Sequence, residues 1–150
     1  MKSSASFEPR HILCPVDFSE LSFLALKYVA VGAREYGAEL TVLHAHAFDL
    51  PRYFVRSETS HLLRELSAAK DLCRWMVQSA SARCDVETVV RKGAPAEEII
   101  RYAREKHEDI IVLCAYHRTF EESTFFGRTT DLVVRHAPVP VLVVPIFPGS

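Results

Sequence analysis

The sequence predicts a single α/β domain with a parallel sheet, because short apolar runs alternate with longer segments of helical period. The apolar runs are five or six residues long and rich in β-branched residues, which is typical of strands buried on both faces of a parallel sheet. A length of 150 residues fits one domain, and no internal repeat or linker divides it. We therefore expect a three-layer α/β/α sandwich, in which helices cover both faces of a five-stranded, Rossmann-like sheet.

The elements follow one another in a regular order. Strands are expected at residues 11–16, 40–45, 86–90, 110–114 and 139–144. Helices are expected to begin at Ser19, near Leu62, at Pro95 and near Gly127, and the first should end at Gly37. The segment from residue 62 to residue 80 carries apolar residues every three or four positions, which predicts a long amphipathic helix. Trp75 lies on it, and we expect this side chain to pack rather than to form a site.

Composition excludes several classes of protein. A formal net charge of -1 and a pI of 6.6 give no general basic field for nucleic acid or a membrane surface. No apolar run is long enough to span a bilayer, and residues 1–6 lack the apolar core of a signal peptide. The four cysteines form no CxxC pair, which favours reduced thiols in the cytoplasm. We expect the domain to occupy residues 10–146, with flexible termini at residues 1–9 and 147–150.

Two loops after predicted strands carry candidate binding residues. Ligands of open parallel sheets bind beyond the carboxyl ends of the strands. Asp17 follows the first strand, where it can accept hydrogen bonds from a ligand hydroxyl or base edge, or simply help Ser19 to start the helix. The loop after the fourth strand is longer than usual and ends at Gly127, whose helix would direct free N–H groups toward an anion. Arg128 and Thr129 would add a cation and a hydroxyl.

Four stretches of the chain together resemble the universal stress proteins, a family of small nucleotide-binding α/β proteins. These stretches are residues 11–19, 37–44, 93–100 and 135–144, and they extend over nearly the whole of residues 10–145. The resemblance implies the strand order 3-2-1-4-5 and a regulatory role in stress response rather than turnover of a substrate. It also implies a homodimer formed through the last strand, at Val141, Leu142, Val143 and Val144. A partner at this edge would cover an unusually apolar strand.

The phosphate-binding motif of the ATP-binding relatives is only partly retained. Its three glycines and its Ser or Thr fall on Cys114, His117, Gly127 and Arg128, so Gly127 alone is kept. Glycine lets backbone amides approach phosphate oxygens, whereas Arg128 would either reach a phosphate or block the pocket. The expectation is weak or absent ATP binding, with Mg²⁺ arriving only with a nucleotide. The pocket implied by the resemblance comprises Pro15, Val16, Asp17, Val42, Gly127, Arg128 and Thr129.

Two alternatives remain open at this stage. One is a protein that binds ATP or another adenine nucleotide with slow or no hydrolysis. The other is a metal- or redox-sensing module, because cysteines and histidines fall near the ends of three neighbouring strands. This set is Cys14, Cys114, His44, His46 and His117. No Ser-His-Asp or Cys-His arrangement identifies a catalytic residue, so enzymatic activity is left undecided.

Overall fold

The computed structural model describes residues 6–47, 56–80, 84–116 and 127–146, in which five strands alternate with four helices. The strands are β1 (His11–Pro15), β2 (Glu39–His46), β3 (Val86–Lys92), β4 (Ile110–Tyr116) and β5 (Val141–Ile146). The helices are α1 (Glu20–Tyr36), α2 (Arg56–Ser79), α3 (Pro95–Glu105) and α4 (Arg128–His136). All neighbouring strands are parallel, in the order β3-β2-β1-β4-β5, which confirms the predicted fold class and strand order.

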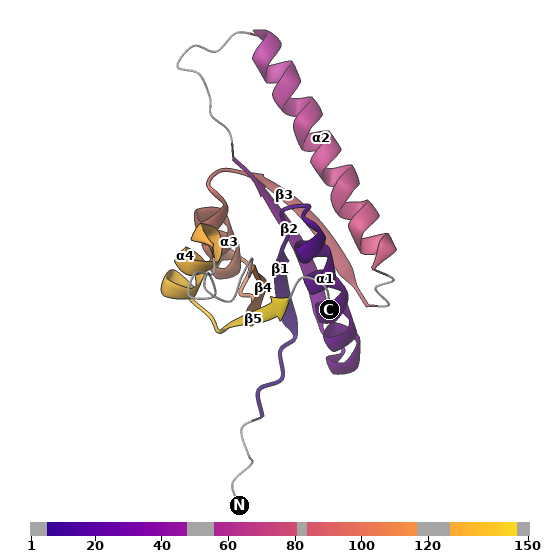
Figure 1. Cartoon of the computed structure of the whole chain (residues 1–150), viewed down its shortest axis with the longest axis vertical. Helices are drawn as coiled ribbons and strands as arrows, with labels where there is room; N and C mark the ends of the chain where they lie inside the picture. The colour runs from indigo at the N-terminus through magenta and orange to yellow at the C-terminus, as the bar shows by residue number, and fades with distance from the viewer. Residues whose placement is uncertain (1–5, 48–55, 81–83, 117–126, 147–150) are drawn as a thin grey trace, which may run out of the picture.

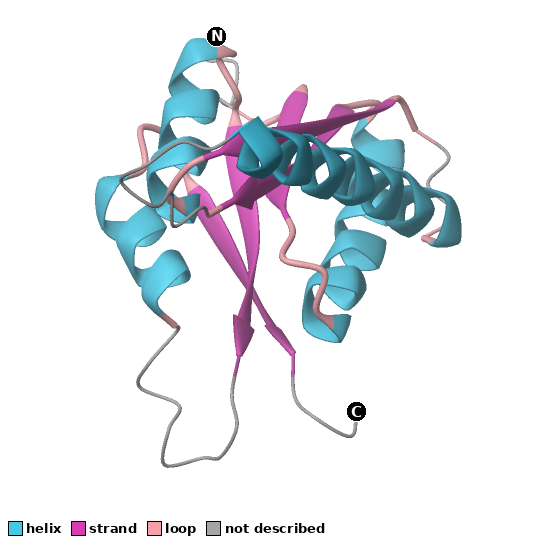
Figure 2. Cartoon of the chain, turned by 90° about the horizontal axis from the view of Figure 1, so that it is seen from above, coloured by secondary structure: helices cyan, strands magenta, loops and turns pink. Residues whose placement is uncertain are grey.

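Helices cover both faces of the sheet, α1 and α2 on one side and α3 and α4 on the other (Figures 1 and 2). Alternate residues of a strand point to opposite faces. Ile12 and Cys14 therefore pack with α1 and α2, whereas Leu13 packs with α3 and α4. The central strands are mainly apolar on both faces because a layer of helices buries each face of the sheet.

Helix α1 begins and ends where its capping residues predict. The Ser22 backbone N–H donates to the Ser19 hydroxyl oxygen over 3.1 Å, which caps the first turn. Gly37 adopts φ 65°, and the next residue, Ala38, donates its N–H to the Ala33 carbonyl oxygen over 2.8 Å. This left-handed ending satisfies carbonyl groups of the last turn and directs the chain into β2.

Helix α2 buries its predicted stripe but leaves its tryptophan outside. Ala69, Cys73 and Met76 are buried in the core. Trp75 is 60% exposed, and its ring stacks on Phe23 of α1 with centroids 6.2 Å apart, so it packs on a neighbouring helix at the surface and not in the core. Its position lies off the buried stripe, where a residue faces solvent or a neighbouring helix. In the described part of the chain, no helix, α2 included, is long and apolar enough to cross a membrane.

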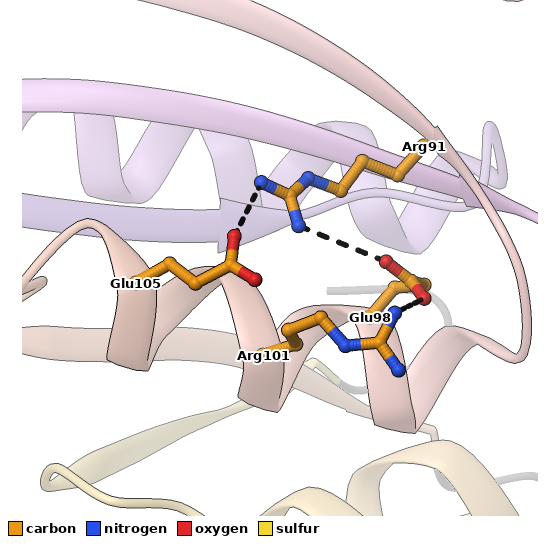
Figure 3. A network of polar contacts seen from close by, with 4 residues as sticks. All are labelled: Arg91, Glu98, Arg101 and Glu105. Carbon is orange, nitrogen blue, oxygen red and sulfur yellow. Dashed lines mark hydrogen bonds and ion pairs between the residues drawn. The ribbon is translucent and has the colours of Figure 1, made fainter.

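The corner between β3 and α3 is held by a network of charges (Figure 3). Glu98, whose side chain is 8% exposed, lies 3.8 Å from the Arg91 guanidinium and also pairs with Arg101. Arg91 in turn contacts Glu105 over 3.0 Å and lies over the Tyr102 ring. A Cβ added to Gly93 would lie 2.8 Å from the Glu98 side chain, so this position needs a glycine. The network fixes α3 against the end of β3.

Strand β5 begins two residues later than predicted. The expected strand at 139–144 counted Val139 and Pro140, but Pro140 has no N–H to donate. Its carbonyl oxygen accepts a hydrogen bond from the Ile111 N–H over 3.0 Å, and regular pairing with β4 continues from Val141 to Ile146. The strand forms one edge of the sheet, as predicted.

Candidate functional site

The loop after β1 presents Asp17 at the carboxyl edge of the sheet. Val16 continues the ladder by donating its N–H to the Leu43 carbonyl oxygen over 2.9 Å, and the chain then turns outward. Asp17 Oδ1 accepts the Ser19 N–H over 3.0 Å, and the Asp17 N–H donates to the Ser22 hydroxyl oxygen over 2.9 Å. The carboxyl group is exposed and held in one orientation, with the start of α1 as its support.

These contacts also set the charge of Asp17. Partial burial acts to raise the pKa of its carboxyl, but hydrogen bonds from Ser19 and Ser22 outweigh burial and hold that pKa below the ordinary value. Asp17 is therefore a carboxylate at neutral pH. A fixed carboxylate accepts hydrogen bonds from hydroxyl or amino groups of a ligand, which is the role considered for it from the sequence.

His44, on the neighbouring strand β2, supports this loop through a hydrogen bond, a role that the sequence did not reveal. Its Nδ1 donates to the Val16 carbonyl oxygen over 2.9 Å, so a neutral ring leaves Nε2 as an acceptor. Phe18, at φ 65°, lies over the ring with centroids 4.1 Å apart. Burial lowers the pKa of His44, although its bond to Val16 opposes the shift. His44 is thus a neutral structural support beneath Asp17.

The start of α4 lies beside β4, at the same carboxyl ends of the strands as Asp17. Gly127 adopts φ 85° immediately before the helix, and its carbonyl oxygen accepts the first helical bond from the Asp131 N–H over 3.0 Å. Thr130 is buried, with its hydroxyl 3.5 Å from the Cys114 carbonyl oxygen, which brings α4 to the end of β4. Gly127 and Thr129 are half-buried and Arg128 is exposed.

The residues predicted for the pocket differ in accessibility. Pro15 is half-buried at the end of β1, and Val16 is buried beside it. Val42 lies in the middle of β2, opposite Cys14 and Thr88, and its side chain is fully buried. The groups that a ligand can reach are therefore the side chains of Asp17, Arg128 and Thr129 and the backbone of Gly127, and not the side chain of Val42.

Substitutions in the phosphate motif are visible where the structure describes them. Cys114 is half-buried at the end of β4, and burial, followed by the charge of Asp17, raises the pKa of its thiol. Cys114 therefore places a neutral side chain at the position of the first glycine in the phosphate-binding motif described above. Arg128 is an exposed cation, and His117 lies outside the described residues.

The proposed metal set does not assemble among the described residues. No group of three or more His, Cys, Asp or Glu side chains there is placed to hold a metal ion. Cys14 is fully buried, and burial raises the pKa of its thiol to about 12, which disfavours the thiolate that metals bind. His46 Nε2 lies 3.1 Å from the Glu65 carboxylate. His44 is bonded to Val16, as described above.

Comparison with known proteins identifies the family. The model of the universal stress protein family matches residues 8–145. This chain belongs to that family. Two universal stress proteins of Methanocaldococcus jannaschii are related to it. MJ0531 is 29% identical, with 90% of this chain and 81% of the relative covered, and MJ0577 is 27% identical, with 90% and 94% covered.

Solved structures of the family share the fold. The universal stress protein UspA from Lactobacillus plantarum matches with a TM-score of 0.72 and 31% identity over 89% of this chain and 95% of that one. A universal stress protein solved in complex with cAMP matches with a TM-score of 0.64 and 21% identity, over 92% and 98% of the two chains. The Archaeoglobus fulgidus protein solved in complex with dAMP matches with 0.58 and 21%, over 91% and 98%.

Proposed function

We propose that this universal stress protein is a regulatory module that binds an adenine nucleotide at the carboxyl edge of β1 and β4 and has little affinity for ATP. The observation that carries the proposal is the Asp17 carboxylate, which is exposed, oriented by Ser19 and Ser22, and ionised at neutral pH. Ligand hydroxyl groups are natural donors to such a carboxylate. Family members solved with cAMP and dAMP support an adenine nucleotide as the ligand class.

The opposite wall of the site favours one phosphate over three. A triphosphate needs several backbone N–H groups at close approach, which glycines allow. This chain offers Gly127 at the start of α4, beside a cysteine at the end of β4. The exposed Arg128 can pair with a single phosphate group, and we expect its long side chain, in place of the motif's Ser or Thr, to obstruct a longer phosphate chain.

The described residues at this edge favour binding over turnover. His44 is nearly buried beneath the Phe18 ring and donates its Nδ1–H to the Val16 carbonyl oxygen, so it supports the loop and is not an accessible base. The Cys114 thiol is kept protonated, so it is a poor nucleophile. Because all four cysteines are free, we place the protein in the reducing cytoplasm, where a ligand-dependent contact with other proteins would serve a stress response.

We also propose that two copies pair through β5. The Ile111 N–H donates to the Pro140 carbonyl oxygen, so the alternate residues Leu142 and Val144 direct their backbone groups toward β4. Val141 and Val143 then direct theirs away from the sheet. An apolar edge strand with outward-facing backbone groups can pair with another strand. The β5 strand of a second copy can fill this place, because a two-fold axis brings the same surface of both copies together.

Calorimetric titration with AMP, cAMP and ATP tests the nucleotide proposal. AMP or cAMP should bind at least tenfold more tightly than ATP. Asp17→Asn should weaken this binding by about 10- to 100-fold, since a hydrogen bond to a charged group contributes about 1.5–3 kcal/mol. Asp85→Asn is the matched control, because Asp85 is exposed immediately before β3, at the amino ends of the strands and away from the proposed site. Equal binding by the Asp17 and Asp85 variants would remove Asp17 from the site.

A further inference from the structure

An aromatic cleft of about 260 Å³ lies between the first turns of α1 and the last turns of α2, two helices that cover the same face of the sheet (Figures 1 and 2). The aromatic residues Phe18, Phe23 and Trp75 line it, together with Leu72 and Met76. Trp75 and Leu72 are 60% and 46% exposed, so the domain leaves part of this lining open to solvent. Exposed apolar side chains that gather around a concavity are typical of a binding site, whereas singly scattered ones are not.

The aromatic walls of the cleft are held in place by the fold. The Phe23 and Trp75 rings stack at the surface, with centroids 6.2 Å apart and an angle of 25° between their planes. The Phe18 ring lies over His44 with centroids 4.1 Å apart, and its backbone adopts φ 65°, which bulky residues rarely do. The aromatic surface is therefore formed before any ligand arrives, and the exposed indole of Trp75 leaves it accessible.

The charges around the cleft favour a cation. Among the described residues that line it, Glu20 alone carries a charge, and it is exposed at the start of α1. The Lys27 ammonium group, one turn further along α1, lies 5.8 Å from the centroid of the Phe23 ring. This distance is within the range over which the face of an aromatic ring attracts a cation. Both the rings and the carboxylate of the cleft therefore attract positive charge and disfavour an anion.

We propose that this cleft binds a small organic cation that carries a quaternary ammonium group. A metal ion or an unsubstituted ammonium ion needs oxygen ligands or water in place of its hydration shell, and apolar walls supply neither. A quaternary ammonium spreads its charge over methyl groups, so it can contact the rings while Glu20 balances its charge.

The proposed cation site is separate from the proposed nucleotide pocket. None of the described residues that line the cleft belongs to that pocket, although Phe18 and Ser19 directly follow Asp17 in the chain. The inference therefore does not depend on nucleotide binding. Choline and AMP should bind without competing for the same place.

The fluorescence of Trp75 tests the site directly, because Trp75 is the only tryptophan of the chain. Choline is titrated into the full chain at constant ionic strength up to about 50 mM, since so small a ligand binds weakly. The control ligand is its uncharged isostere, in which carbon replaces nitrogen. Choline should change the emission of Trp75 saturably and bind at least about fivefold more tightly than the isostere, because only the cation gains from the rings and from Glu20. Broadening of the choline methyl resonance by the protein provides a second measurement of binding.

Variants separate the contributions of charge and ring. Glu20→Gln and Phe23→Leu should each weaken choline binding by about two- to fivefold. Glu35→Gln is the matched control for Glu20, because Glu35 is exposed at the other end of α1, and it should leave the affinity unchanged. Lys27→Met should tighten choline binding, because it removes a competing cation from Phe23, and should not tighten binding of the isostere. Circular dichroism confirms that each variant folds.

Four results would contradict the proposal. Neither a change in emission nor a broadened resonance at the highest concentration would remove the site. Equal affinities for choline and its isostere, or unchanged binding in both Glu20→Gln and Phe23→Leu, would show that the cleft does not recognise a cation. Competition between AMP and choline would assign the cleft to the nucleotide instead. Tighter binding of a short peptide with a trimethylated lysine would identify a protein side chain, and not a small solute, as the ligand.

Discussion

Replacement of Gly93 by alanine should destabilise the domain through one identifiable contact. Gly93 adopts φ 142° in the turn between β3 and α3, a conformation that residues other than glycine rarely adopt. The new Cβ would lie 2.8 Å from Cγ and Oε1 of Glu98. Because Glu98 is nearly buried, its carboxylate cannot move aside without leaving Arg91 and Arg101.

The expected cost has two parts. Backbone strain at this φ contributes about 1–3 kcal/mol. Displacement of the Glu98 carboxylate weakens its contacts with Arg91 and Arg101. We expect about 1–2 kcal/mol for this part rather than more, because Arg101 is 55% exposed and solvent screens its charge. Gly93→Ala should therefore reduce the free energy of unfolding by about 2–5 kcal/mol.

A double-mutant cycle separates the two parts. In a Glu98→Ala background the clash is absent and the strain remains, so Gly93→Ala should cost about 1–2 kcal/mol less there than in the wild type. Urea unfolding followed by circular dichroism measures all four proteins. Equal costs in the two backgrounds would show that the contact with Glu98 does not constrain Gly93. A cost below about 0.5 kcal/mol in the wild type would refute the strain as well.

Four further predictions concern other parts of the molecule. Gly32→Ala should raise the free energy of unfolding by about 0.5–1 kcal/mol in urea, because it favours the helix and meets open space. Burial lowers the pKa of His44 in the folded protein, so below about pH 6.5 the unfolded chain binds a proton at this residue more readily than the folded chain does. The free energy of unfolding should therefore decrease as the pH is lowered, by at most about 1.4 kcal/mol per pH unit. His44→Asn, which keeps the donor to Val16, should reduce this slope. Cys14 and Cys73 have thiol pKa values raised by burial to about 12 and about 11, so a thiol reagent at neutral pH should label them only on unfolding. Arg128→Ser should tighten ATP binding in a calorimetric titration if the arginine obstructs the phosphate chain, and unchanged or weaker binding would contradict this role.

The elements of the fold could be predicted because local signals and burial agree. Ser19 caps the start of α1 with its side-chain hydroxyl, and Gly37 ends the helix because glycine readily adopts a positive φ. The apolar runs are strands because helices cover both faces of the sheet. Periodicity alone does not order the strands, and the order came from the resemblance to a family.

Other features depend on neighbours that the sequence does not place together. His44 supports Asp17 because β2 lies beside β1, and from the sequence alone it was grouped with possible metal ligands. Glu98 lies in the first turns of α3, where carboxylates are usually solvated, and its burial depends on Gly93 and Arg91. Trp75 shows the opposite case, because this large aromatic residue of an amphipathic helix lies just off the buried stripe and is 60% exposed.

The most direct measurement of the central claim is the ratio of the dissociation constants for ATP and AMP, obtained by calorimetry on the same protein preparation. Asp17, Gly127 and the exposed Arg128 predict a ratio above about 10, a preference of about 1.4 kcal/mol for the single phosphate. Asp17→Asn should weaken the binding of AMP. Tight binding of ATP with a ratio below 1, or binding of neither nucleotide at millimolar concentration, would contradict the account.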